Sequence, residues 1–356
     1  MDRRDFITST MALATLPAIG VSAQEATSPP TDKRIKVGFL GGAHSHGLGK
    51  AKVLLEQPEI WNIIGIVEES EEVAARYAKL GIKALDEEEL LATADVILVE
   101  SDNEDHYKHG KLVVDSGKHL HLEKPPTMTL EEFQEIIAIA TSKKVLVQMG
   151  YMWRFNPGIN AALEAAREGW LGDIYLVKAE ISKLQSEEAR LTNDFPGGTM
   201  FELGCHVIDP VVRLLGRPTK VNAYLKTSGD FGDEIKDNTI AVFDYPKVTA
   251  MVGSTILQHT GGGERQLYIY GTNGTALVKP LDRPVMELNL RTAMGPYMKG
   301  KQRIEFPPYR RYIGELEELA AAVRGEKPLG VTPEIDLLVH ETLLRACGVD
   351  GRSNGQ

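Results

Sequence analysis

Cysteine is scarce in this chain. Long apolar runs and clusters of basic residues are missing after Ala23. Cys205 and Cys347 are the only cysteines, and they lack the Cys-x-x-Cys spacing of zinc or redox sites. The sequence leaves open whether they form a disulfide. After Ala23 no apolar stretch is long enough for a membrane span, so we expect none. Acidic residues outnumber basic ones, 50 to 40, without a Lys/Arg run, which argues against a nucleic-acid partner.

Residues 1–23 have the features of a cleavable export signal. Arg3-Arg4 forms a basic start, a mildly apolar run follows to Ala18, and Val21-Ser22-Ala23 supplies a small-x-small cleavage site. The alternative is an N-terminal helix that frays. Arg3-Arg4-Asp5-Phe6-Ile7 is similar to a twin-arginine signal, which exports folded proteins. We therefore expect a periplasmic or otherwise exported protein, with a flexible tether at 24–33 and a C-terminal tail at 350–356.

The rest of the chain is too long for one compact core and predicts two domains, 34–150 and 151–349. In the first, strands alternate with helices, which predicts an α/β Rossmann domain with a parallel sheet. Its expected strands are 35–41, 61–67, 96–99, 119–122 and 145–150, and its expected helices are 48–57, 71–80, 85–91, 105–116 and 129–141. The second has β-rich runs at 174–184, 220–227, 239–245, 248–256, 266–270 and 276–279, then helices at 312–324 and 333–347.

A glycine-rich turn follows the first expected strand. It departs from the dinucleotide pattern Gly-x-Gly-x-x-Gly, because Ala43 and His46 hold the second and third glycine positions. Amides at the following helix start can still face a phosphate. Glu68 ends the second strand, where a carboxylate accepts from the ribose hydroxyls and repels a 2′-phosphate, so we favour NAD over NADP. The cofactor residues expected here are Gly41, Gly42, Ala43, His44, His46 and Glu68. A merely polar strand end is the alternative for Glu68.

Glu123-Lys124-Pro125 forms a corner after the strand 119–122. Ligands of open α/β sheets bind at the carboxyl ends of the strands. Pro125 restricts Lys124 to extended backbone geometry, so the ammonium is presented on a stiff turn. A neighbouring glutamate favours the charged lysine. The alternative is a solvated charged turn.

Three motifs together resemble the Gfo/Idh/MocA family of oxidoreductases (glucose–fructose oxidoreductase, inositol dehydrogenase and rhizopine catabolism). They are Gly117-Lys118-His119-x-x-x-Glu123-Lys124-Pro125, Arg154-Phe155-Asn156-Pro157 and the run 197–209. The resemblance extends from about Ile35 to Val349. It implies a Rossmann domain followed by an α/β domain with a large, mostly antiparallel open sheet. Such a sheet commonly mediates assembly, so we expect a homo-oligomer, a dimer or a tetramer.

The resemblance also assigns residues to the site. Lys124 matches the lysine that contacts the nicotinamide ribose and the reacting hydroxyl, and His206 matches the histidine that acts as general acid or base. Glu202 lies where relatives have an aspartate, and on a regular helix it would share a face with His206 and hydrogen-bond its imidazole. The remaining expected cofactor residues are Ser101, Asn103, His106 and Glu123, and the expected substrate residues are Tyr151, Arg154, Asp209 and His206. Packing between domains is the alternative for Tyr151, Trp153 and Arg154, and an ion pair with Arg213 is the alternative for Asp209.

Export combined with nicotinamide chemistry favours a closed redox cycle, because an exported enzyme has no free cofactor pool. The sequence thus predicts an NAD-dependent oxidoreductase acting on a sugar or cyclitol hydroxyl, with tightly bound NAD recycled in each turnover. Two alternatives stay open: an NAD-dependent glycoside hydrolase that oxidises its substrate transiently, and a sugar-binding protein without catalysis. The pair His44-x-His46 is a poor zinc signature without further ligands at fixed spacing, so we expect no metal.

Overall fold

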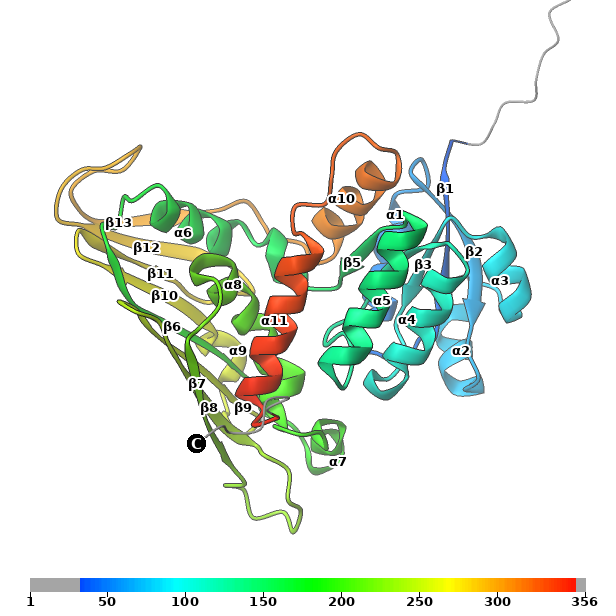
Figure 1. Cartoon of the computed structure of the whole chain (residues 1–356), viewed down its shortest axis with the longest axis horizontal. Coiled ribbons are helices and arrows are strands. Elements are labelled where there is room, and N and C mark those ends of the chain that lie inside the picture. The colour runs from blue at the N-terminus through cyan, green and yellow to red at the C-terminus, as the bar shows by residue number, and fades with distance from the viewer. Residues whose placement is uncertain (1–32, 350–356) are drawn as a thin grey trace, which may run out of the picture. The chain divides into compact units, whose positions relative to one another are not determined.

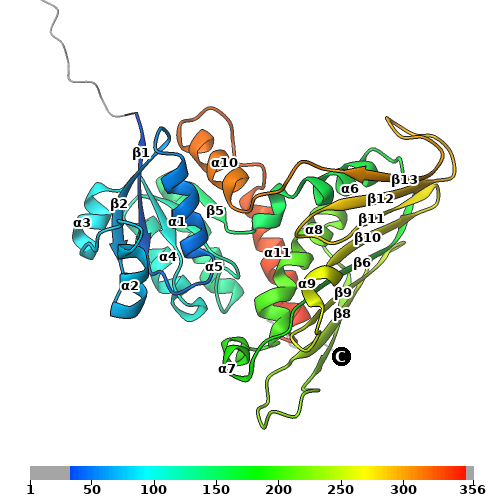
Figure 2. The same cartoon turned by 180° about the vertical axis from the view of Figure 1, so that it is seen from behind.

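The computed structural model describes residues 33–349. All helices and strands of this range belong to one compact unit that begins at Arg34 (Figures 1 and 2). The expected signal, nearly all of the expected tether and the C-terminal tail lie outside the described residues. Within the described range, no helix is both long and apolar enough to cross a bilayer.

The first half forms a five-stranded sheet in the order β2-β1-β3-β4-β5, with every pair parallel. This confirms the predicted Rossmann sheet, and β2, β3 and β4 have the predicted bounds. The strands are β1 (Ile35–Leu40), β2 (Trp61–Val67), β3 (Val96–Val99), β4 (His119–Leu122) and β5 (Val147–Met149). The helices are α1 (Gly47–Glu56), α2 (Glu71–Ala78), α3 (Glu87–Thr93), α4 (His106–Asp115) and α5 (Leu130–Lys143). Helix α5 begins at a capping box formed by Thr129 and Glu132.

The second half forms an eight-stranded sheet in the order β13-β12-β11-β10-β6-β9-β8-β7, in which only β6 and β9 pair in parallel. This confirms the large, mostly antiparallel sheet. Its strands are β6 (Ile174–Ser182), β7 (Lys220–Lys226), β8 (Asn238–Asp244), β9 (Thr249–Thr255), β10 (Gln266–Gly271), β11 (Gly274–Val278), β12 (Val285–Leu290) and β13 (Gly300–Glu305). Asn273 lies in the turn between the antiparallel strands β10 and β11, and Gly274 begins β11.

The sequence prediction missed the strands β12 and β13. In β12, Met286, Leu288 and Leu290 alternate with polar residues and are buried, a period-two signal that was available. Strand β13 has only Ile304 as an apolar side chain and pairs at the edge of the sheet. Pairing to β12, rather than hydrophobic pattern, therefore defines β13.

Helices of the second half cover one face of the large sheet (Figures 1 and 2). They are α6 (Pro157–Arg167), α8 (Cys205–Leu215) and α11 (Pro333–Ala346), with the short α7 (Glu187–Arg190) and α9 (Gly261–Glu264) nearby. A π-helical turn, Met200–Gly204, leads directly into α8. Cys205 and Cys347 are both buried free thiols.

Helix α10 (Ile313–Val323) belongs to the range predicted for the second domain but packs on the first. Its Leu316 and Leu319 are fully buried in a cluster with residues of β1 and α1, and both views show α10 beside α1 (Figures 1 and 2). This return of the chain brings Tyr312 and Glu315 to the carboxyl-end edge of the parallel sheet, where the candidate site lies.

Candidate active site

The loops after β1 and β3 meet where the strand order of the parallel sheet reverses. Ligands of open α/β sheets bind at such a point. Gly41 has φ +72°, and a Cβ atom there would lie 2.5 Å from the Cβ of Ser101. Only glycine accepts both the backbone angle and the close approach. The structure therefore places the predicted cofactor residues Gly41 and Ser101 side by side.

The turn after β1 has the features that a dinucleotide requires. Helix α1 begins at Gly47 without an acidic residue in its first turn, and the His46 side chain makes no capping hydrogen bond. The Gly47 amide itself donates to the His44 carbonyl oxygen at 3.0 Å, so the amides suited to a phosphate are those of the next helical residues, Leu48 and Gly49. The Glu68 carboxylate accepts from the amides of Gly42 (2.7 Å) and Ser70 (2.9 Å), so this acid lies against the turn. The residues present fit a dinucleotide, with Glu68 at the expected ribose position.

His106 joins the loop after β3 to the corner after β4. Its ring is fully buried, with Nδ1 2.7 Å from the carbonyl oxygen of Pro125 and Nε2 3.2 Å from that of Ser101. Asn103, on the same loop, donates to Glu202 Oε2 at 2.9 Å. This loop therefore fixes the positions of Glu123-Lys124-Pro125 and of Glu202.

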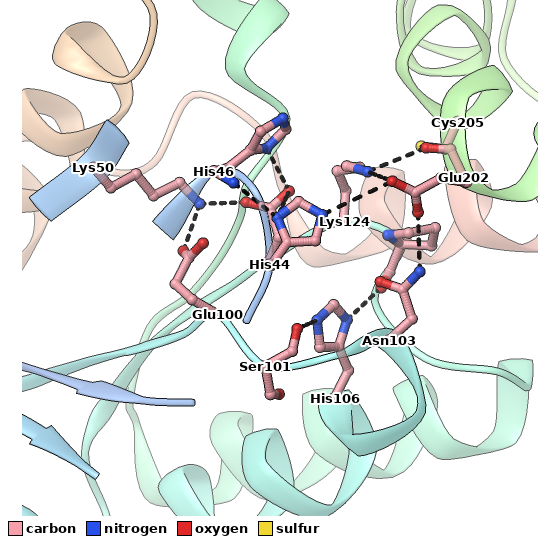
Figure 3. A network of polar contacts seen from close by, with 12 residues as sticks. His44, His46, Lys50, Glu100, Ser101, Asn103, His106, Lys124, Glu202 and Cys205 are labelled. Atoms are coloured by element: carbon pink, nitrogen blue, oxygen red, sulfur yellow. Dashed lines mark hydrogen bonds and ion pairs between the residues drawn. The ribbon is translucent and has the colours of Figure 1, made fainter. Parts of the chain in front are cut away.

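Lys124 lies at the carboxyl end of β4 and is 1% exposed. Its Nζ donates to Glu202 Oε1 at 2.8 Å and to the Glu202 carbonyl oxygen at 3.1 Å (Figure 3). Burial disfavours the ammonium, but the Glu202 carboxylate together with the other negative groups nearby, Glu123 among them, outweighs burial and raises the pKa of Lys124. Lys124 is thus a charged donor at neutral pH and not a base.

The expected hydrogen bond between Glu202 and His206 is wrong. The Glu202 carboxylate binds Lys124 and Asn103 instead. The π-helical turn Met200–Gly204 explains the difference, because its i→i+5 hydrogen bonds break the regular i, i+4 alignment of the two side chains. Residues 202, 206 and 209 therefore do not share one face of a regular α-helix. The sequence contains no signal that predicts this π-helical turn.

His206 is 3% exposed and surrounded by rings. Its ring centroid lies 5.4 Å from that of Trp153, 5.8 Å from that of His46 and 6.3 Å from that of Tyr151. Burial lowers the pKa of His206 well below its ordinary value, and the Lys124 ammonium lowers it further. Its Nδ1 has no hydrogen-bond partner within residues 33–349. His206 is thus a neutral imidazole at neutral pH, which is the form that accepts a proton.

A buried charged cluster beside Glu123 escaped the sequence prediction. Lys50 Nζ lies 2.6 Å from Glu100 Oε1, forms a second short ion pair with Glu123, and lies 4.0 Å from Glu315 Oε1. All four side chains are 0% exposed. Burial raises the pKa of Glu100 to about 8 and that of Glu315 to about 7, while Lys50 opposes both shifts. The available signal was Lys50, a charge on the apolar face of helix α1.

The two histidines of the glycine-rich turn lie against Glu123. His46 Nδ1 is 3.0 Å from Glu123 Oε1, His44 Nδ1 is 4.0 Å from it, and His44 Nδ1 accepts from the His46 amide at 3.3 Å. These donors lie close enough together for a metal ion. However, His46 and Glu123 already bind one another, and the Lys50 ammonium neutralises the carboxylate. The absence of a metal stays a prediction.

The predicted substrate residues Arg154 and Asp209 bind each other. The Arg154 guanidinium donates to Asp209 at 2.9 Å and to Asp336 at 2.5 Å, and Arg213 lies 3.4 Å from Asp209. The contact with Arg213 is the ion pair that the sequence analysis gives as the alternative role of Asp209. Arg154 also lies over the ring of Tyr151, 4.7 Å from its centroid, and that ring lies against His206. This buried network holds the Tyr151 ring against His206. A direct role of Arg154, Asp209 or Tyr151 in substrate binding stays a prediction.

The parallel sheet, the turn that fits a dinucleotide and the charged lysine beside a neutral histidine define an NAD-binding oxidoreductase. Residues 35–151 match the family model described as "Oxidoreductase family, NAD-binding Rossmann fold", and residues 159–277 match the "GFO/IDH/MocA C-terminal domain". The chain belongs to the Gfo/Idh/MocA family of oxidoreductases, as the sequence motifs imply.

Curated relatives of the chain include sugar and cyclitol dehydrogenases. A scyllo-inositol 2-dehydrogenase (NADP(+)) of Bacillus subtilis (strain 168) is 26% identical over 253 residues, which cover 67% of this chain and 70% of that one. The D-glucoside 3-dehydrogenase of Escherichia coli (strain K12) is 28% identical over 162 residues, or 40% of this chain and 45% of the relative. The chain thus matches less than half of the second relative's length.

Solved structures with the same fold include one in complex with NAD. GenD2 from gentamicin A biosynthesis, in complex with NAD, superposes with a TM-score of 0.73 at 22% identity and covers 90% of this chain and 95% of its own. A UDP-N-acetylglucosamine 3-dehydrogenase from Acidithiobacillus ferrooxidans superposes with a TM-score of 0.75 at 19% identity. The match covers 89% of this chain and 97% of the other chain. At these identities the likeness shows the fold alone.

Proposed function

We propose that the protein is an NAD-dependent oxidoreductase that acts on a hydroxyl group of a sugar or cyclitol. The observation that carries this proposal is geometric: near the carboxyl end of β4, the buried Lys124 donates to Glu202 at 2.8 Å, and the buried His206 keeps an Nδ1 without a hydrogen-bond partner among residues 33–349. Lys124 is kept charged by Glu202, while burial and Lys124 keep His206 neutral. The names of the sugar and cyclitol dehydrogenases among its relatives support the substrate class.

The two residues have complementary roles in such a reaction. The Lys124 ammonium would donate a hydrogen bond to the reacting hydroxyl oxygen and stabilise negative charge that develops there. The neutral His206 imidazole would accept the hydroxyl proton as general base. Bound NAD supplies the acceptor for the hydride. Trp153 and Tyr151 pack around His206 and exclude water from the reacting centre.

We further propose that NAD stays tightly bound and is recycled in each turnover, and that the protein is exported by the twin-arginine route. The support for export is Arg3-Arg4 with the apolar run and cleavage site that follow. Replacing both arginines with lysine should leave the protein in the cytoplasm with its cofactor, because the signal lies outside the catalytic fold. Unchanged export of this double variant would point to another route and weaken the argument for recycling.

We also propose a homo-oligomer formed through the large sheet. Helices cover one face of this sheet, while Tyr175, Tyr224 and Ile240 on its strands are exposed large hydrophobic residues. Exposed apolar side chains gathered on a sheet favour burial against another copy. Light scattering of the purified protein tests this, and a monomer at micromolar concentration would contradict it.

The function is tested by identifying the cofactor and then the substrate class. Denaturing the protein purified from its native compartment should release about one dinucleotide per chain, without a 2′-phosphate. Adding single sugars and cyclitols should then reduce bound NAD, seen as nicotinamide absorbance. Product analysis separates an oxidised sugar from a cleaved glycoside. A protein that neither contains nor binds a dinucleotide would overturn the cofactor assignment, and failure to reduce bound NAD with any compound would favour a binding protein.

A further inference from the structure

Hydroxyl oxidation produces a proton for which the proposed mechanism gives no destination beyond His206. The alcohol carbon loses a hydride to NAD+, the hydroxyl loses its proton, and the products are a ketone, NADH and H+. The base that receives this proton, His206, is 3% exposed, and its partner Lys124 is 1% exposed. A return reaction in the same turnover needs the hydride and the proton again. The inference below therefore rests on the proposed function.

The cluster around Lys50 has an excess of buried negative charge. It brings three carboxyl groups, Glu100, Glu123 and Glu315, within 4.0 Å of one ammonium, and none of the four side chains is exposed. With every group ionised, one positive and three negative charges leave a net charge of −2. A buried excess of this kind is strongly unfavourable unless the cluster binds protons or a cation.

The hydrogen-bond pattern indicates which carboxyl groups bind protons. Glu100 Oε2 and both oxygens of Glu315 are buried without a hydrogen-bond partner among residues 33–349. By contrast, both Glu123 oxygens have partners, Lys50 on one side and His46 on the other. The pKa of Glu123 is held well below its ordinary range although burial alone would raise it, because Lys50 and His46 outweigh burial. Glu123 is thus the ionised member, and Glu100 and Glu315 are the members that bind protons.

His46 connects this cluster to the reacting centre. Its Nδ1 lies 3.0 Å from Glu123 Oε1, and its ring centroid lies 5.8 Å from that of His206. An imidazole can take up a proton at one nitrogen while it releases another from the second nitrogen. Because Glu123 accepts from Nδ1, the proton released from His46 would pass to the carboxylate that Lys50 links to Glu100.

We propose that the Lys50–Glu100–Glu123–Glu315 cluster is a buried proton store that takes up, through His46, the proton released by hydroxyl oxidation and returns it on reduction. The step is balanced within the protein: the hydride stays on the bound dinucleotide and the proton stays on a carboxyl group. His46 is a relay residue of this path, and Glu123 positions it. No oxidant or reductant other than the proposed NAD is required.

Other charged or titratable groups face the cluster from every element packed on it. His121 of β4 lies 4.0 Å from Glu100 and binds Gln148 of β5. Further neighbours that influence the cluster carboxyls are His44 of the glycine-rich turn, Tyr77 of α2, Arg154 and Glu318 of α10, and Tyr312 precedes α10. Burial lowers the pKa of His121 to about 3, so it contributes no charge at neutral pH.

The store itself can be tested without any substrate. Infrared spectra of protein labelled with 13C-glutamate should show a protonated carboxyl band at neutral pH that fades as the pH rises through about 8. The band should be weaker in Glu100→Gln and unchanged in Glu317→Gln, an exposed carboxylate on α10. Because the wild-type protein alone shows the band, the test does not depend on the variants folding. A folded wild-type protein without this band at neutral pH would overturn the proposal.

The acceptor role is tested by counting protons with an indicator dye while a sugar reduces bound NAD. The wild-type protein should release fewer than one proton per NADH formed, and fewer at about pH 8 than at about pH 6, because the store has more vacant sites at high pH. His46→Gln and Glu315→Gln should release close to one, and Glu317→Gln should match the wild type. One proton per NADH in the wild type would refute the acceptor role. If no sugar reduces the cofactor, the proposed function fails, and the infrared band still decides whether the cluster holds a proton.

Discussion

Lys124 Nζ lies 2.8 Å from Glu202 Oε1, and this bond joins the corner after β4 to the π-helical turn before α8. The lysine comes from the Rossmann half of the chain and the glutamate from the half with the large sheet. The contact has two consequences. It keeps the Lys124 ammonium charged in a buried position, and it turns Glu202 away from the histidine that the sequence predicts as its partner.

Replacing Lys124 with alanine should lower turnover by about 10²–10³-fold, the range typical of losing one preorganised donor in a buried site. Steady-state kinetics with the sugar that reduces bound NAD measures this loss. Lys108→Ala, which removes an exposed lysine of α4, is the matched control. Parent-like turnover of Lys124→Ala would show that the corner after β4 does not act on the substrate.

The change His206→Ala should reduce turnover by ~10²–10⁴-fold, the usual contribution of general acid–base catalysis. The dinucleotide content of the purified variant should stay the same, because the predicted cofactor residues all lie in the first half of the chain. His259→Ala, at an exposed position, serves as the control. A variant that loses its dinucleotide would instead assign His206 to cofactor binding.

Glu202→Gln should shift the alkaline limb of the activity profile to lower pH. Burial lowers the pKa of Lys124, whereas the Glu202 carboxylate raises it, so removing this negative charge lets burial count for more. The ammonium then loses its proton at a lower pH than in the parent. Rates measured across the alkaline range test this, with the exposed Glu188→Gln as control. An unchanged alkaline limb would separate activity from the charge of Lys124.

Glu68→Ala should relax the preference for NAD over NADP. The carboxylate lies against Gly42 and Ser70, where it would repel a 2′-phosphate. We expect the ratio of the two dissociation constants to change by roughly tenfold, about 1.4 kcal/mol. Calorimetry on cofactor-stripped protein measures both constants, and the exposed neighbour Glu69→Ala is the control. Equal affinity of the parent for both dinucleotides would remove the role given to Glu68.

Glu100→Gln should flatten the pH dependence of stability. The pKa of Glu100 is raised to about 8 in the folded protein, so the unfolded chain releases this proton first as the pH rises. The contribution of Glu100 to the free energy of unfolding is therefore fully present below the ordinary pKa of a glutamate. As the pH rises from there to about 8, this contribution falls by about 1.4 kcal/mol per pH unit. Denaturant unfolding at several pH values should show a shallower slope in Glu100→Gln than in the parent and in Glu104→Gln, with the remaining slope coming from Glu315. Equal slopes in all three proteins would mean that Glu100 is ionised in the folded state.

The sequence determined the class of protein and the elements of the parallel sheet. Strands β2, β3 and β4 have their predicted bounds because unbroken apolar runs and turn residues act locally. Lys124 and His206 were identified from short motifs. The sequence did not reveal Lys50, Glu100 and Glu315 as partners, because they come from three elements that meet only when α10 returns to the first sheet.

Only the tertiary structure decided how the identified side chains are paired. A regular helix places Glu202 next to His206, but the π-helical turn and the buried ammonium of Lys124 direct the carboxylate elsewhere. Likewise, Arg154 and Asp209 neutralise each other and Asp336, which no local pattern indicates. The physical reason is the same in each case. A buried charge must find its partner among all groups that the fold brings near, and that choice depends on distances between elements far apart in the sequence.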